Sequence, residues 1–206
     1  GRGFVDALGA RYGTLKGKRI MIICGKGNNG GDGFVIGRHC VNRGAGVEVV
    51  LLTRRKDVKG DARVNLEILL QMRSKRKGRL KVKEAPTTRM FSGFRPPDII
   101  VDALFGTGFS GQATGVHRKA IEWINSSTAF VAAVDIASGV NATDGDVEGP
   151  AVRAGHTVTM GLAKVGHMVG AGKEHCGETT IIDISIPPQV YSPAHNQTYL
   201  VESTDV

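Results

Sequence analysis

The side chains of this sequence that could do chemistry carry oxygen atoms and stand directly after apolar segments. Asn29 lies in a glycine-rich stretch, residues 25–33, that follows one such segment. Asp102 ends a second apolar segment, and Asp135 and Ser138 follow a third. Two carboxylates that lie close together repel each other, unless one is protonated or a cation lies between them. The set therefore predicts a cation site built from amide, carboxylate and hydroxyl oxygens.

The kind of cation follows from the kind of ligand. Oxygen ligands are hard, so an alkali or alkaline-earth ion suits this set, whereas zinc would call for histidine or cysteine. A site of amide, carboxylate and hydroxyl oxygens with only one direct carboxylate ligand suits a monovalent ion such as potassium.

These side chains can meet only if the segments before them are neighbouring strands of one sheet. The predicted strands are 19–24, 47–53, 98–102, 130–135, 157–160 and 180–184, with 80–83 as a possible short one. Helical spacing occurs in residues 34–43, 61–73 and 118–125, after a short helical lead-in at 4–8. Continuous apolar strands that alternate with helices are typical of an α/β protein whose parallel sheet is covered on both faces. The loops after such strands gather at one edge of the sheet.

The glycine-rich stretch is typical of a loop that binds anions between a strand and a helix. It matches G-x-G-x-x-G at Gly25, Gly27 and Gly30, a pattern that by itself indicates a dinucleotide fold only weakly. A dehydrogenase of that fold normally ends its second strand with an acidic residue that holds the ribose. Here the second strand ends in Thr53-Arg54-Arg55, which argues against a plain dehydrogenase.

Length and composition are those of one globular domain. The chain has 206 residues, of which 41% are hydrophobic and 22% charged. It has no run of about 18 apolar residues, so we expect no membrane association through a spanning helix. We expect a single domain over residues 1–206, with its core at about 17–187 and residues 188–206 as a C-terminal strap or the start of a linker.

Charge and cysteine content narrow the partners and the compartment. The net charge is +8, and much of it lies in residues 54–56 and 73–81. These runs are either a phosphate-binding patch or a solvated helix end. They lack interleaved aromatic residues that could stack on bases, so we do not expect a nucleic-acid partner. Three cysteines without a CxxC pair are typical of a reduced intracellular protein. We expect the cytoplasm first, with the mitochondrion and the plastid left open.

Four segments in this order and spacing carry a family resemblance. They are GKGNNGGDG at 25–33, DALFGTGFSG at 102–111, VDIASGVN at 134–141 and TVTMGLAKVG at 157–166. Together they resemble the NAD(P)H-hydrate epimerase family, that is, the YjeF N-terminal domain, over about residues 17–187. One departure is Ala137, where the family usually has proline.

The resemblance implies a Rossmann-like α/β fold, a three-layer sandwich with a mostly parallel central sheet. It implies an isomerase that interconverts the R and S forms of hydrated NADH and NADPH, called NADHX and NADPHX, as a step in cofactor repair. A separate or fused dehydratase would then act on the S form. The resemblance also implies a homodimer and one potassium ion per subunit. Proteins of the same fold also serve as non-catalytic scaffolds in messenger-RNA decapping, and this is the alternative function.

Motif position implies which residues form the site. Potassium would be held by Asn29, Asp102 and Ser138. The substrate would contact the two glycine-rich loops and Asp135, that is, Asn28, Asn29, Gly30, Gly31, Asp32, Gly106, Thr107, Gly108, Phe109, Ser110, Gly111, Gln112 and Asp135.

Epimerisation requires an acid that helps a hydroxyl to leave and a base that directs water to the other face. We expect Asp135 to fill the main acid–base role, with Asp32 and Lys164 as further catalytic candidates. Asp32 has an alternative role as the cap of a helix that starts at Gly33. Lys164 has an alternative role in a surface salt bridge. The six histidines have no metal-ligand spacing, so we expect them in packing or surface positions.

Overall fold

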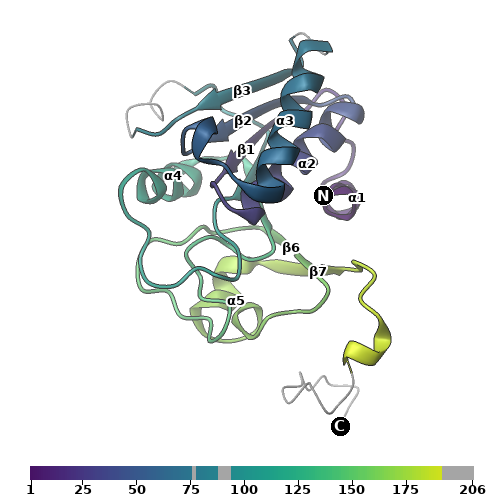
Figure 1. Ribbon diagram of the computed structural model, residues 1–206. Helices are drawn as coiled ribbons and strands as arrows, with labels where there is room; N and C mark the ends of the chain where they lie inside the picture. Colours follow the sequence, from purple (N-terminus) through teal and green to yellow (C-terminus); the bar gives the residue numbers. More distant parts are fainter. Residues whose placement is uncertain (76–77, 88–93, 192–206) are drawn as a thin grey trace.

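The computed structural model describes residues 1–75, 78–87 and 94–191, which form an α/β sandwich (Figure 1). Two parts of the sequence predictions lie outside these residues. They are residues 76–77 of the basic run and the C-terminal stretch from residue 192 onward. The stretch that we predicted as a strap or linker begins with a short 3-10 helix, η4 (Pro188–Tyr191).

The strands form one parallel sheet. They are β1 (Arg19–Cys24), β2 (Gly46–Leu51), β3 (Leu80–Glu84), β4 (Ile99–Ala103), β5 (Phe130–Val134), β6 (His156–Met160) and β7 (Glu178–Ile182). Their order across the sheet is β3-β2-β1-β4-β5-β6-β7, and every neighbouring pair is parallel. The expected sheet is thus confirmed, and the possible short strand after residue 79 is β3.

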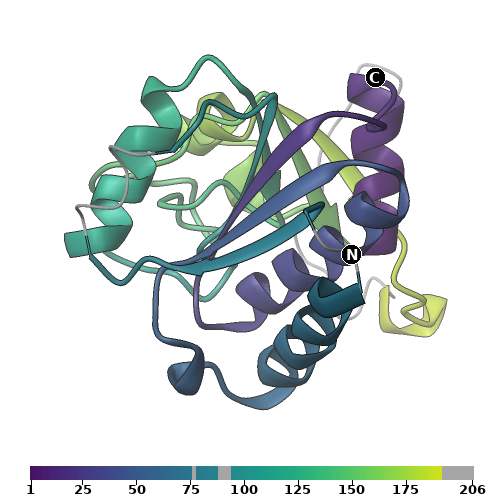
Figure 2. The ribbon, with the colours of Figure 1, turned by 90° about the horizontal axis from the view of Figure 1, so that it is seen from above.

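The helices lie on both faces of this sheet. They are α1 (Arg2–Tyr12), α2 (Asn28–Asn42), α3 (Gly60–Lys75), α4 (Gly115–Ser126) and α5 (Gly170–Cys176), with short 3-10 helices η1 (Arg55–Asp57) and η3 (Val165–His167). Seen from above, the sheet runs between α2 and α3 on one side and α4 on the other (Figure 2). The three layers expected of a Rossmann-like domain are therefore present.

Successive side chains of a strand point to opposite faces of the sheet, so each face has its own apolar core. In β1, Ile20 and Ile22 pack with the apolar faces of α1, α2 and α3, whereas Met21 and Ile23 pack with α4. All four are at most 2% exposed. A strand that is buried on both faces reads as a continuous apolar run, which is why β1 could be recognised from the sequence.

The strand order reverses direction at β1. This strand pairs with β2 on one side and with β4 on the other, so the loops that follow β1 and β4 leave the sheet in opposite directions. The crevice that opens between such loops is where open α/β sheets bind ligands. The fold therefore places the glycine-rich stretch at the position where a ligand is expected.

The start of α2 corrects one prediction. We expected a helix from about Gly33, with Asp32 as its possible cap, but α2 begins at Asn28 and has Gly27 as its N-cap. Glycine and asparagine are poor helix formers, so local propensity hides this first turn. Tertiary packing decides it, because a Cβ on Gly30 would lie 2.1 Å from the Gly25 carbonyl oxygen. Only glycine allows the helix to begin so close to the end of β1.

The helix α5, the polarity of the surface and the lengths of the helices complete the description of the fold. The short helix α5 was not predicted, because its sequence GAGKEHC has no apolar periodicity.

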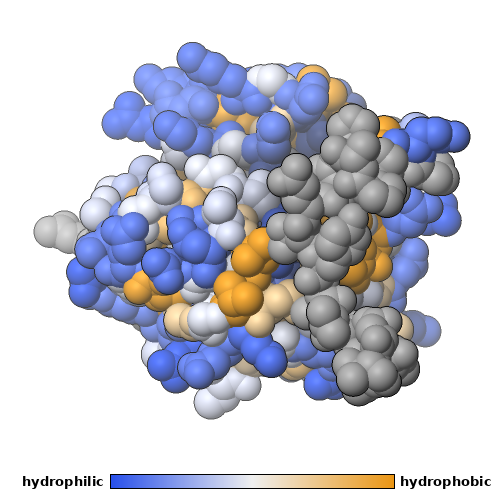
Figure 3. Space-filling model, turned by 90° about the horizontal axis from the view of Figure 1, so that it is seen from below, coloured by the Kyte–Doolittle hydropathy of each residue, from blue (hydrophilic) through white to orange (hydrophobic). Residues whose placement is uncertain are grey.

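Seen from below, the surface is mostly polar, with an apolar area near the middle of this face (Figure 3). Among the described residues, no helix combines the length and the apolar character needed to cross a bilayer.

Candidate functional site

A cavity of about 610 Å³ lies at the carboxyl edge of the sheet, where the loops after β1, β4 and β5 meet. Its lining residues are Gly25, Lys26, Gly27, Asn28, Asn29, Asp32, Leu104, Phe105, Gly106, Thr107, Gly108, Phe109, Ser110, His117, Asp135 and Met160. The two predicted glycine-rich loops thus face one space, together with Asp135. A cavity of this size is within the range of small-molecule and cofactor sites.

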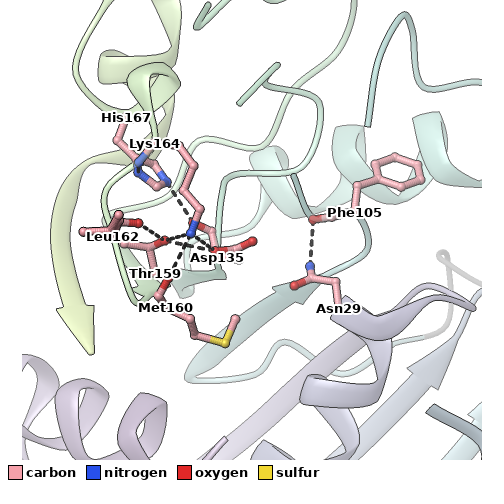
Figure 4. A network of polar contacts seen from close by, with 8 residues as sticks. All are labelled: Asn29, Phe105, Asp135, Thr159, Met160, Leu162, Lys164 and His167. Carbon is pink, nitrogen blue, oxygen red and sulfur yellow. Dashed lines mark hydrogen bonds and ion pairs between the residues drawn. The ribbon is translucent and has the colours of Figure 1, made fainter. Parts of the chain in front are cut away.

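Close packing between two loops shapes the floor of the cavity. A Cβ on Gly25 would lie 2.2 Å from the Leu104 carbonyl oxygen, so a side chain at this position would separate the loops. The Nδ2 of Asn29 donates to the Phe105 carbonyl at 2.7 Å and links the same loops (Figure 4). Asn29 therefore has its amide nitrogen engaged, and its side-chain oxygen is the atom left for a ligand.

Asp102 lies beneath this floor and is 0% exposed. Its Oδ1 accepts a hydrogen bond from Ser138 Oγ at 2.7 Å and its Oδ2 accepts one from Ser138 N at 2.8 Å. The backbone N–H of Leu104 donates to Oδ1 at 3.2 Å. Phe105 N–H in turn donates to Ser138 Oγ at 3.0 Å. The ends of β4 and β5 are thus joined through one buried carboxylate.

The turn after β5 brings Ser138 to this position. Gly139 follows it with φ +104°, and a Cβ there would lie 2.6 Å from the Pro150 carbonyl oxygen. Both the positive φ and the short distance to the Pro150 carbonyl require glycine at this position. Ala137 occupies the position where the resembled family has proline, and it is fully buried within this turn. The polar contacts of Ser138 form with alanine at this position.

The buried carboxylate fits the chemistry of a hard cation site. Burial raises the pKa of Asp102 to about 6, although the hydrogen bonds from Ser138 and Leu104 act in the opposite direction. Within the described part of the chain, no ion pair reaches Asp102. A negative charge that is buried without a cation is costly, and a bound cation would offset this cost. Ser138 contacts Asp102, and Ser138 and Asn29 both contact the Phe105 carbonyl. This chain of contacts contains hydroxyl, carbonyl and amide oxygen atoms, in keeping with an oxygen-ligated ion.

Asp135 ends the neighbouring strand and has a different environment. Its Oδ1 accepts hydrogen bonds from Lys164 Nζ at 2.7 Å and from Thr159 Oγ1 at 2.9 Å. Lys164 Nζ also donates to Thr159 Oγ1 at 2.7 Å and to the Met160 carbonyl at 3.1 Å. The ammonium is thus held by three acceptors (Figure 4). Because both contacts fall on Oδ1, the second carboxylate oxygen is left for a ligand in the cavity.

The backbone of Asp135 is unusual as well. Its φ is +68°, a conformation that residues with a Cβ rarely adopt. Its N–H donates to the Val158 carbonyl at 2.9 Å, and its own carbonyl lies 2.8 Å from His167 Nε2. Strained backbone that the surroundings hold in place is typical of functional positions.

Asp32 reaches the same cavity from the first turns of α2. Its side chain is 33% exposed. Burial raises the pKa of Asp32, and the negative charge of Asp135 raises it further. The two carboxylates therefore interact across the cavity. Since Asp32 lies inside α2, its alternative role as a helix cap is wrong.

The other predicted site residues divide into two groups. Asn28 and the loop residues from Gly106 to Ser110 line the cavity. Gly30, Gly31, Gly111, Gln112, Asp102, Ser138 and Lys164 do not belong to its lining. Gly31 packs on α3, because a Cβ there would lie 3.0 Å from Ala62 Cα. Lys164 reaches the site through Asp135.

Sequence reasoning missed several residues of the site. Lys26 and His117 line the cavity, and burial, followed by the charge of Lys26, lowers the pKa of His117. The Phe105 ring stacks on Phe109 with centroids 4.4 Å apart and lies 5.1 Å from the His117 ring. His167 is buried, as expected of a packing position, and its ring also contacts the Asp135 carbonyl, which the sequence does not indicate. No metal-ligand or catalytic spacing marks either histidine, so the sequence carries no signal for them.

Comparison with known proteins identifies relatives along most of the chain. The family model described as YjeF-related protein N-terminus matches residues 1–166. The "Bifunctional NAD(P)H-hydrate repair enzyme Nnr" of Moorella thermoacetica is 43% identical over 183 residues, which are 89% of this chain and 34% of that protein. The "NAD(P)H-hydrate epimerase" of Pirellula staleyi is 40% identical over 172 residues, which are 82% of this chain and 74% of that protein.

The matches differ in how much of each relative the chain covers. The chain spans about a third of the length of the bifunctional relatives, 34% in Moorella thermoacetica and 39% in Salinibacter ruber. The crystal structure of yeast ynu0 superposes with a TM-score of 0.73 at 21% identity, and the match covers 98% of this chain and 84% of that one. The structural match shows the shared fold.

Proposed function

The chain belongs to the family of YjeF-related N-terminal domains, and on this premise we propose that it is an NAD(P)H-hydrate epimerase. The observation that carries the proposal is one cavity that is lined by two carboxylates, Asp32 and Asp135, of which the second is held by an ammonium. Relatives that are named as epimerases and repair enzymes support an isomerase. Neither of these relatives has a name that favours the alternative of a non-catalytic scaffold.

The substrate class has a built-in route to epimerisation. A hydrated nicotinamide ring carries a hydroxyl on the carbon next to the ring nitrogen. When the C–O bond breaks, the nitrogen lone pair forms a C=N⁺ bond, and the hydroxyl takes up a proton and leaves as water. Water then forms a new C–O bond on the other face and gives up a proton. The reaction is balanced without an oxidant or reductant, and the protein needs to supply one acid and one base.

The two carboxylates of the cavity suit these roles because their surroundings differ. Asp135 is paired with the Lys164 ammonium, so we propose that it is the ionised carboxylate that accepts the proton of the attacking water. Asp32 has a pKa raised by burial, so we propose that it delivers the proton to the departing hydroxyl. Carboxyl groups whose environments differ are a common way to divide acid and base duties. Negative charge beside the positively charged ring also stabilises the intermediate.

Lys164 acts behind Asp135 in this proposal. It contacts Oδ1 and does not belong to the cavity lining, so it orients the carboxylate without touching the substrate. Its hydrogen bonds to Thr159 and to the Met160 carbonyl hold the ammonium in one place. Preorganised groups of this kind lower the reorganisation that the reaction requires.

We propose that one potassium ion per subunit binds at Asn29, Asp102 and Ser138. When bound, the ion supplies positive charge that compensates Asp102. The donor set of hard oxygen atoms and the buried, unpaired carboxylate support this assignment. Asn29 and Ser138 both contact Phe105, so the same residues hold the second glycine-rich loop in its place at the cavity.

The charges of the cavity also support one orientation of the dinucleotide. Lys26 and His117 line it together with the N-terminus of α2, whose free N–H groups favour anions. We propose that this end takes the phosphates and that the carboxylate end takes the nicotinamide ring. The stacked rings of Phe105 and Phe109 offer an apolar wall between them.

The test is epimerisation of purified (R)-NADHX, followed through consumption of the S form by an S-specific dehydratase. We expect the chain to accelerate conversion well above the spontaneous rate, and more strongly with potassium than without it. An unaccelerated rate under both conditions would overturn the proposed function. Asp98 lies at the amino end of β4, away from the cavity, so an Asp98→Asn variant with wild-type activity is the matched control.

Three expectations from the family remain proposals. We propose that the protein is a homodimer, which light scattering of the purified chain would test. We propose that it works with a dehydratase, either fused, as in the bifunctional relatives, or separate. We also propose an intracellular location, with the cytoplasm first, because the cofactors that it repairs are used there.

A further inference from the structure

His167 joins the two halves of the Asp135–Lys164 pair. It is the last residue of η3 and is 2% exposed. The backbone N–H of Lys164 donates to His167 Nδ1 at 3.0 Å. On the other side of the ring, Nε2 lies 2.8 Å from the Asp135 carbonyl oxygen (Figure 4). One imidazole therefore bridges the backbone of both residues.

The two contacts determine which nitrogen of the ring carries hydrogen. Nδ1 accepts from an N–H, so it has a lone pair and no hydrogen. Nε2 faces a carbonyl oxygen, which can only accept, so Nε2 carries the hydrogen and donates it. His167 is therefore neutral, in the Nε2–H tautomer. Burial lowers its pKa, which favours the same neutral form.

The Asp135 carbonyl needs such a partner. With φ at +68°, Asp135 is in a region that is unfavourable for a residue with a Cβ. Its N–H is held by Val158 of β6, and His167 holds its carbonyl. Together with Lys164 and Thr159 on the carboxylate, these contacts fix both the backbone and the side chain of Asp135.

The loop that carries Lys164 needs the same partner. The segment between β6 and α5 leaves the sheet after Met160, and η3 closes back on Lys164 through its N–H. A lysine on a free loop would keep its rotamer freedom, and holding its side chain in one conformation has an entropic cost. The imidazole ties the start of this turn to the end of β5 and thereby brings the ammonium to the carboxylate.

We infer that His167 is a positioning residue that holds Asp135 and Lys164 in register for the proposed epimerisation. The kinetic test of this inference rests on the proposed function. The structural test rests only on the two contacts of the ring. The imidazole takes no part in bond making, since it does not line the cavity.

Three substitutions separate the contacts of the ring. His167→Leu removes both, His167→Asn keeps an acceptor near the Nδ1 position, and His167→Gln keeps a donor near the Nε2 position. We expect kcat to fall about tenfold to a hundredfold in the leucine variant, since small displacements of catalytic groups have effects of this size. KM should change little, and the glutamine variant should recover part of kcat because it still reaches the Asp135 carbonyl.

The matched control is His156→Gln. His156 is also buried, but it lies at the start of β6 and contacts Thr180. We expect its substitution to affect stability and to leave kcat unchanged. A His167→Leu variant that is folded and has kcat within twofold of wild type would overturn the inference.

A second measurement does not depend on catalysis. Nitrogen-15 shifts of the His167 ring should report the Nε2–H tautomer, because Nδ1 accepts from Lys164 N–H and Nε2 donates to the Asp135 carbonyl. An Nδ1–H tautomer or a charged ring would overturn the bridge. If the wild-type chain shows no epimerisation, the proposed function fails while this spectrum still decides whether His167 bridges the two residues.

Discussion

Asp102 and Asp135 end neighbouring strands of one sheet, yet the protein treats them in opposite ways. Asp102 is fully buried and takes its hydrogen bonds from neutral donors, two of Ser138 and one of Leu104. The side chain of Asp135 is 13% exposed, lines the cavity and is paired with an ammonium. The same residue type at equivalent strand ends therefore has two different environments.

The difference lies in how each charge is compensated. Asp135 has Lys164 beside it, so it needs no further cation. Asp102 has neutral donors alone among the described residues, and burial raises its pKa to about 6. A carboxylate of this kind is suited to hold an ion, whereas a paired carboxylate at a cavity wall is suited to exchange protons. Four substitutions and one pH series test this difference.

The largest expected effect is that of Asp135→Asn. We expect kcat for epimerisation to fall about 10²–10⁴-fold, because an amide cannot accept the proton of water. The fold should persist, since the site of the substitution lies at the cavity wall. Coupled assays and circular dichroism measure the two properties. If Asp135→Asn keeps its rate while the matched Asp102→Asn loses it, the assignment of tasks is reversed.

A smaller loss is expected from Lys164→Met, which keeps the apolar stem and removes the ammonium. We expect kcat to fall about tenfold to a hundredfold, because Asp135 loses the group that orients it. KM should stay near the wild-type value, since Lys164 does not line the cavity. A raised KM with unchanged kcat would show instead that the lysine touches the substrate.

Asp102→Asn should act mainly on the ion. The amide keeps the shape but loses the charge, so we expect the response of Tm and of activity to potassium to disappear. Replacing one partner of buried hydrogen bonds costs about 1–3 kcal/mol. For a chain of this size, each kcal/mol lowers Tm by about 2–4 °C. Thermal melts in potassium and in a large organic cation measure this, and an unchanged response to potassium would place the ion elsewhere.

Ser138→Ala tests the neutral donors of Asp102. It removes the Oγ–H bond to Oδ1 and the acceptor of the Phe105 N–H, and it leaves the backbone donor of residue 138 in place. We expect a loss of about 1–2 kcal/mol in the free energy of unfolding, with weaker potassium binding. Ser126→Ala is the control, because Ser126 Oγ donates to the Trp123 carbonyl at an exposed position. Equal losses in the two variants would contradict the role of Ser138.

The smallest effect concerns pH and the two buried histidines. Burial lowers the folded-state pKa of His167 and His156. At these two residues the unfolded chain binds more protons than the folded one below about pH 6.5, so their contribution to stability falls as the pH drops through this value. The raised pKa of Asp102 acts in the opposite direction, because the folded state then binds the extra proton. Denaturant unfolding of the wild type and of His156→Gln at several pH values isolates the histidine contribution, and we expect the variant to lose less stability on acidification without a change in kcat. The same pH slope in both proteins would contradict the direction for His156.

Much of this architecture could be predicted from the sequence. The apolar runs of β1 and β5 are long and continuous, because each strand is buried on both faces. The asparagine and aspartate residues that end or follow strands could be placed at one edge, since parallel strands share their direction. The first turn of α2 and the short helix α5 could not be predicted, because neither has an apolar period and both depend on packing with glycine.

The fold class, the family and the edge of the sheet where the predicted site residues gather could be inferred from the sequence, because they depend on local patterns and their order. The apolar runs do not distinguish Asp102 from Asp135, since each ends such a run, and it is the family resemblance that implied different roles for them. The burial of one under Ser138 and the position of the other at the cavity beside Lys164 follow from the folded structure. The contacts of His167 and His117 were decided there as well. Burial and charge pairing arise between segments far apart in the chain, so no local pattern contains them.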